Sequence, residues 1–135
     1  MENEDFIHDS VVFASASTYR LLGSSIRVSV NTSLDKTRFI GSPSNPLYPD
    51  VIVWNPNTGE TLVIEAIETS NSINSNVENW RQYASSGPSF FLVIPEEKAD
   101  LVKQILDREN IKPSKLQTYR LNDRDLQVMF GEIRL

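Results

Sequence analysis

YPDVIVWNPNTGETLVIEAIETSNSI, from Tyr48 to Ile73, is the stretch that decides the fold. It contains two apolar runs, 51–54 and 61–64, and the residues 55–59 between them read Asn-Pro-Asn-Thr-Gly. Because β-branched and aromatic residues favour strands while Asn, Pro and Gly form turns, the stretch predicts a β-hairpin.

One carboxylate lies at each outer end of this hairpin. If Asn55 and Glu60 flank a four-residue loop, the antiparallel register places Asp50 opposite Glu65. Directly opposed residues in such a ladder have Cβ atoms about 4.5 to 5.5 Å apart. Two carboxylates at that distance repel each other, and a hard divalent cation with oxygen ligands removes the repulsion. The spacing therefore favours a metal site.

Two alternatives remain open at this point. A register slip of one residue replaces Glu65 by Ala66 and leaves Glu68 on the side of Asp50. The acids can also be surface residues that keep sheet edges unpaired in an unrelated α/β domain.

Pro49-Asp50, the short hairpin and Glu65-Ala66-Ile67 resemble the motif of the PD-(D/E)xK nuclease superfamily. The position of the family's lysine falls on Ile67, which cannot activate a water. Residues 67–73 with Trp80-Arg81-Gln82-Tyr83 also resemble small members in which a glutamate stands in the lysine's place. In that second alignment Glu68 takes the third position and Ala66 the position of the first acid.

The resemblance implies a restriction-endonuclease-like fold, which is an α/β fold with three layers and a central mixed β-sheet flanked by helices. It also implies Mg²⁺ or Mn²⁺ held by Asp50, Glu65 and Glu68, with the same acids hydrolysing DNA phosphodiester bonds. Gln82 or Arg81 of the following helix would supply part of what Ile67 lacks. The alternative is a nuclease fold that has lost catalysis and serves as a binding or regulatory module, with a protein partner or as a homodimer.

Periodicity along the chain predicts elements in the order α-β-β-β-α-β-α-β-β. The continuous apolar run Ser89-Phe-Phe-Leu-Val-Ile94 is typical of a central strand. Ser75 and Glu78 have the spacing of a capping box, which predicts a helix that ends before Gly87. The other expected elements are helices over 5–22 and 95–110 and strands over 25–31, 51–54, 61–64, 115–121 and 126–133, the last two joined through 122–125.

The polar segment 32–47 is expected to be a long loop that either lies over a substrate or connects without structure. Its basic residues Lys36 and Arg38, together with Arg81 of the later helix, are the candidate contacts to nucleic acid.

The first helix offers Asp9, or less readily Glu4, as a further acid near a metal, although an acid in a first turn also complements the helix dipole. His8 is the only histidine. With no partner histidine or cysteine it is assigned no chemistry.

Composition sets the remaining expectations. The 135 residues are expected to form one domain, 1–135. Thirteen basic and eighteen acidic side chains give a net charge of −5, which counts against tight binding of free DNA. The sequence has no cysteine and no apolar run of the roughly 20 residues that span a bilayer, and residues 1–5 are acidic where a secretory signal would be basic. We therefore expect a cytoplasmic protein without a membrane partner.

Overall fold

A computed structural model describes residues 4–32, 34–122 and 127–135 of the chain. Its elements follow the predicted order, with one additional short hairpin before the central one. They are α1 (Glu4–Arg20), β1 (Arg27–Val30), β2 (Ile40–Ser42), β3 (Asn45–Leu47), β4 (Val51–Trp54), β5 (Thr61–Ile67), α2 (Val77–Ala84), β6 (Ser89–Pro95), the 3-10 turn η1 (Glu96–Lys98), α3 (Ala99–Glu109), β7 (Lys115–Asn122) and β8 (Gln127–Ile133).

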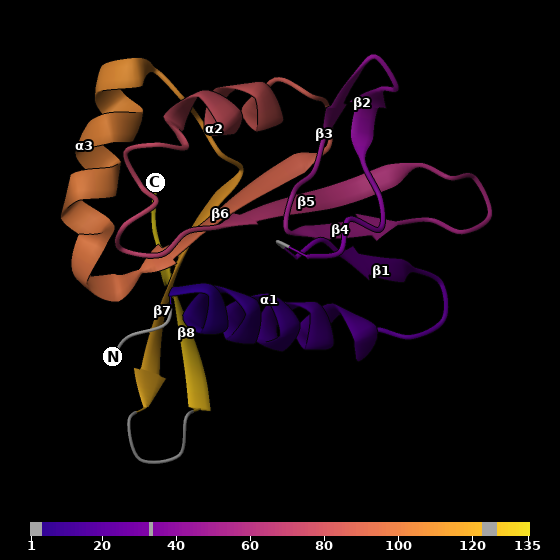
Figure 1. Cartoon of the computed structure of the whole chain (residues 1–135), viewed down its shortest axis with the longest axis horizontal. Helices are drawn as coiled ribbons and strands as arrows, with labels where there is room; N and C mark the ends of the chain where they lie inside the picture. The colour runs from indigo at the N-terminus through magenta and orange to yellow at the C-terminus, as the bar shows by residue number, and fades with distance from the viewer. Residues whose placement is uncertain (1–3, 33, 123–126) are drawn as a thin grey trace.

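Six strands form one mixed sheet in the order β1-β4-β5-β6-β7-β8, and β2 pairs only with β3. The sheet is antiparallel from β1 to β5, parallel from β5 to β7, and antiparallel again between β7 and β8. The helix α2 connects β5 to its parallel neighbour β6 (Figure 1). The α/β class and the central mixed sheet are therefore confirmed.

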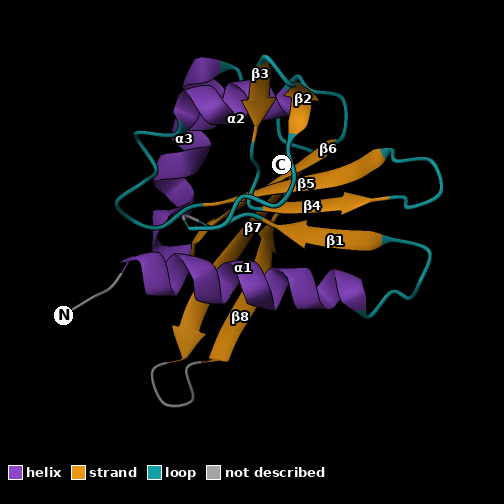
Figure 2. Cartoon of the chain, turned by 45° about the vertical axis from the view of Figure 1, so that its right-hand side comes forward, coloured by secondary structure: helices purple, strands orange, loops and turns teal. Residues whose placement is uncertain are grey.

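Helices cover both faces of the sheet, α1 on one face and α2 with α3 on the other (Figure 2). On the α1 face, Val51, Val53 and Ile67 pack against Val12 and Ala16 of the helix. The opposite face carries a larger cluster that includes Ile64, Trp80, Phe90, Leu92 and Ile105. Successive strand residues alternate between these two clusters, as the two-residue period of a strand requires.

Two local expectations were wrong. The loop expected over 32–47 contains the hairpin β2–β3. The capping box at Ser75 does not form, because α2 begins after Asn76 and the Ser75 hydroxyl donates to the Ser72 carbonyl instead. The connection expected at 122–125 lies largely outside the residues that the structure describes.

The register of the central hairpin also differs from the expectation. Trp54 pairs with Thr61 as predicted, but Ile52 pairs with Ile64 and Glu65 pairs with Val51. The pairing shifts between Val53 and Trp54, where Leu62 is the extra residue on β5. A bulge of this kind leaves one residue of the strand unpaired. Every later side chain of β5 therefore points to the face opposite to the one that an unbroken register would give.

Within the described ranges, none of the helices combines the length and the apolar character that a membrane span requires.

Candidate functional site

The bulge separates the two acids expected to share a metal. Asp50 directly precedes β4, and its carboxylate contacts His8 of α1 and the Ile67 amide at the end of the sheet. Glu65 lies on the α1 side between Val63 and Ile67. The expected pairing of Asp50 with Glu65 is wrong, because Glu65 pairs with Val51. Asp50 lines one cleft with Glu68, the acid of the alternative register, and Glu65 does not line that cleft.

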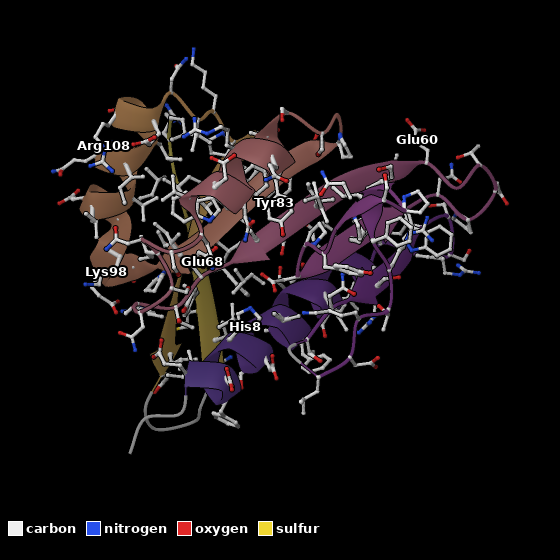
Figure 3. All side chains as sticks on the ribbon, turned by 45° about the horizontal axis from the view of Figure 1, so that its top comes forward. His8, Glu60, Glu68, Tyr83, Lys98 and Arg108 are labelled. Atoms are coloured by element: carbon white, nitrogen blue, oxygen red, sulfur yellow. The ribbon has the colours of Figure 1, made fainter. Side chains whose placement is uncertain are left out.

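A polar cleft of about 280 Å³ opens at the carboxyl end of β5. Residues of α1, of the segment before β4 and of α2 form its walls, and Figure 3 labels His8, Glu68 and Tyr83 among them. Its polar lining consists of Glu4, Asp5, His8, Thr32, Lys36, Tyr48, Asp50, Glu68, Thr69, Ser72, Asn76, Asn79 and Tyr83.

Both carboxylate oxygens of Asp50 have protein partners. His8 Nε2 lies 3.0 Å from Oδ1, and the backbone N–H of Ile67 donates to Oδ2 at 2.6 Å. The backbone also holds this residue, because the Asp50 N–H donates to the Glu65 carbonyl and the Asp50 carbonyl accepts from the Asn31 N–H, each at 2.9 Å. Asp50 is therefore fixed at the junction of β1, β4 and β5.

His8 lies in the second turn of α1 between two acids, since its Nδ1 is 3.1 Å from Asp9 Oδ1. Burial lowers the pKa of His8, but the hydrogen bonds and charges of Asp50 and Asp9 outweigh burial and raise that pKa to about 9. At neutral pH the ring is therefore an imidazolium paired with Asp50. No chemistry was expected of His8 from the sequence, but in the structure it lines the cleft and contacts Asp50.

Glu68, which is 3% exposed, accepts three side-chain hydrogen bonds. Ser72 Oγ and Asn76 Nδ2 donate to Oε1 at 2.6 and 2.8 Å, and Trp80 Nε1 donates to Oε2 at 2.7 Å. Burial raises the pKa of Glu68, the three donors lower it, and the charge of Asp50 raises it, with a net increase. The glutamate thus ties the end of β5 to the start of α2.

Glu65 forms a separate polar cluster on the other face. It is 1% exposed and accepts hydrogen bonds from Ser15 Oγ at 2.5 Å and from Tyr19 Oη at 2.6 Å. Burial raises the pKa of Glu65 and exceeds the lowering by these two hydroxyls. Burial and the charge of Glu65 also raise the pKa of Tyr19. These contacts fasten α1 to β5, away from the cleft.

The three basic residues expected to contact nucleic acid do not lie together at the cleft. Lys36 lines the cleft. Arg38 lies 3.8 Å over the Trp54 ring and donates to the Gly59 carbonyl, and Arg81 pairs with Glu78 and Glu109. Neither arginine is among the residues described as lining the cleft, and neither is Gln82.

Asn31 is a buried anchor that the sequence did not reveal. Its amide group donates to the carbonyls of Arg38 and Pro49, and its Oδ1 accepts from the N–H groups of Thr37 and Arg38. These four bonds fix both ends of the segment that leads into Asp50. A single asparagine after a strand carries no sequence signal for such a role, and the same holds for Ser72, Asn76 and Trp80.

The donor set does not fit a divalent cation. A Mg²⁺ ion needs oxygen ligands at about 2.0 to 2.1 Å in near-octahedral geometry. The oxygens of Asp50 and Glu68 are committed to protein donors, Ala66 stands where the second acid is expected, and the Ile67 side chain packs toward α1. Within the described part of the chain, no group of three or more His, Cys, Asp or Glu side chains is arranged to hold a metal ion.

Comparison of the chain with protein-family models, with curated proteins and with solved structures finds no match in any of the three. The family expected from the motif therefore remains a prediction.

Proposed function

We propose that this chain is a restriction-endonuclease-like domain that does not hydrolyse phosphodiester bonds and serves as a binding or regulatory module. The fold part of the proposal is supported by the order of elements, by the mixed sheet, and by the α2 crossover from the central hairpin to β6. The position of the motif residues Pro49 and Asp50 directly before β4 is a further support.

One observation supports the loss of catalysis. Groups of the protein itself already contact or donate hydrogen bonds to the carboxylates of Asp50 and Glu68 in the cleft. Asp50 has an imidazolium and a backbone amide, and Glu68 has three side-chain donors. A carboxylate engaged in this way is a structural hydrogen-bond acceptor, and freeing it for a cation costs the bonds it already makes. The three hydrogen bonds of Glu68 compensate the loss of solvation that its burial causes.

The charge of the molecule favours a protein partner over DNA. The net charge is −5, and the cleft brings together the acids Glu4, Asp5, Asp50 and Glu68 against the cations His8 and Lys36. Nucleic-acid binding needs cations that neutralise phosphates. Of the three basic residues expected to contact DNA, only Lys36 lines the cleft.

The test is a calorimetric titration of Mn²⁺ into the wild-type protein and into Asp50→Ala, with Glu60→Ala as the control. Glu60 is an exposed acid in the β4–β5 turn, far from the cleft (Figure 3). We expect no saturable binding in any of the three proteins at millimolar Mn²⁺, and no cleavage of plasmid or branched DNA. Binding by the wild type and by Glu60→Ala that is lost in Asp50→Ala would overturn the proposal.

A metal-dependent nuclease is the second candidate, and one observation favours it. Asp50, Glu68 and Lys36 line the same cleft. Of the two further acids expected from the first helix, Glu4, the less favoured, is among the lining residues and Asp9 is not. Activity would require His8 to leave Asp50 and the donors of Glu68 to rearrange. Mn²⁺-dependent cleavage of DNA that is lost in Asp50→Ala is the result that would establish it.

A further inference from the structure

His8 contacts the Asp50 carboxylate at the oxygen that a bound metal ion would contact. The imidazole Nε2 is 3.0 Å from Oδ1, while the other oxygen faces the Ile67 amide. The His8 and Asp50 side chains are 23% and 21% exposed, so solvent screens this pair less than it screens a surface ion pair. The second ring nitrogen contacts Asp9 Oδ1 at 3.1 Å, and the two contacts together fix the orientation of the ring.

The surroundings of this pair are acidic. Glu4 and Asp5 line the cleft from the first turn of α1, and Glu68 lines it close enough to Asp50 for the charge of Asp50 to raise the pKa of Glu68. Several carboxylates around one cavity repel each other unless a cation lies among them. Lys36 contributes a positive charge to the wall, but it is the His8 ring that contacts the Asp50 carboxylate.

We infer that His8 is a built-in counter-cation that excludes divalent metal ions from the cleft by taking the place on Asp50 that such an ion would occupy. This inference rests on the proposed function. The chemical class excluded is a hard divalent cation, with Mg²⁺ and Mn²⁺ as the examples. His8 acts here through its charge and its position on Asp50 and is not a catalytic residue.

The inference predicts that loss of the ring exposes a cation site. In His8→Ala, Asp50 loses its cation and gains an open volume beside Oδ1. We expect saturable Mn²⁺ binding in the millimolar range or tighter by calorimetry, together with a rise in Tm on addition of Mn²⁺, because a ligand that binds only the folded state stabilises it. Both effects should vanish in the double variant His8→Ala/Asp50→Asn.

A charge-restoring variant provides the matched control. His8→Lys returns a cation to the same helix position, and we expect it to bind no Mn²⁺. Circular dichroism establishes that each variant is folded, and His8→Gln, which removes the charge but keeps most of the volume, replaces His8→Ala if the alanine variant does not fold.

The outcomes separate the two proposals. Absence of binding in both the wild type and the folded His8→Ala or His8→Gln variant overturns the inference and leaves the proposed function intact. Equal binding by His8→Lys and His8→Ala overturns it as well, because charge would then not be the cause of exclusion. Binding by the wild type that requires Asp50 overturns the proposed function, and with it this inference.

Discussion

Glu65 illustrates how one backbone position decides the role of a side chain. Its neighbour Ala66 faces the cleft, whereas the Glu65 carboxylate points to the α1 side and accepts bonds from Ser15 and Tyr19. A buried carboxylate with two hydroxyl donors stabilises the attachment of a helix to a strand, provided that all members of the cluster are present.

We predict that Glu65→Ala lowers the free energy of unfolding by about 2 to 3 kcal/mol, since the change leaves two hydroxyls unpaired and a cavity at a buried site. Urea denaturation at neutral pH is the measurement. The exposed Glu60→Ala serves as the control and should change stability by less than about 0.5 kcal/mol. A loss at Glu65 as small as that of the control would contradict the structural role.

His8 predicts a dependence of stability on pH. Its pKa is about 9 in the folded protein against 6.5 for an unperturbed histidine, so its contribution to stability is fully present below pH 6.5 and is lost as the pH rises through 9. After a discount for the partial exposure of the pair, this contribution is about 1 to 2 kcal/mol. The difference in unfolding free energy between wild type and His8→Gln should therefore be largest near pH 6 and should disappear near pH 10. A difference that grows with pH would refute the assigned ion pair.

Prediction from the sequence was limited most clearly at the scale of elements. Apolar runs and turn residues located β4, β5 and β6, because those signals are local. The bulge at Leu62 was not predictable, since the residues before and after it are both apolar or β-branched and nothing in their pattern marks an unpaired residue. The hairpin β2–β3 was missed because its three-residue strands contain Gly41 and Pro46, which are typical of loops.

Asn31 connects this irregular segment to the sheet, and its loss should loosen the segment as a unit. We predict that Asn31→Ala lowers the unfolding free energy by about 2 to 3 kcal/mol, because four backbone groups lose their partner. Hydrogen exchange of the Thr37 and Arg38 amides, which donate to Asn31, should accelerate by at least about tenfold. Asn57→Ala in the exposed β4–β5 turn is the control, and unchanged protection at Thr37 in Asn31→Ala would contradict the anchoring role.

At the scale of the whole molecule, two of the acids that the fold brings to one cleft, Asp50 and Glu68, could be named from the sequence. They were predicted to lie together only in the second of two possible hairpin registers. It missed His8, because a contact between residues 8 and 50 depends on how α1 lies across the sheet. The expected homodimer and protein partner remain predictions.

The net charge gives a further prediction at this scale. In about 150 mM salt the protein should show no binding to duplex DNA by fluorescence anisotropy at micromolar protein. The reason is that too few Lys and Arg side chains lie together to displace the counterions of the DNA phosphates. Lys36→Ala should behave as the wild type does. Micromolar affinity that decreases steeply with salt and requires Lys36 would contradict the assignment of the cleft.

The account depends most on the claim that the protein itself neutralises Asp50. The most direct measurement is a nuclear magnetic resonance titration of the wild-type protein with Mn²⁺, in which a bound ion broadens nearby amide signals. We predict that the Ile67 and Glu68 amides broaden no more than those of α3, which lies outside the cleft. Selective loss of the Ile67 and Glu68 signals at low Mn²⁺, with recovery in Asp50→Asn, would contradict the account.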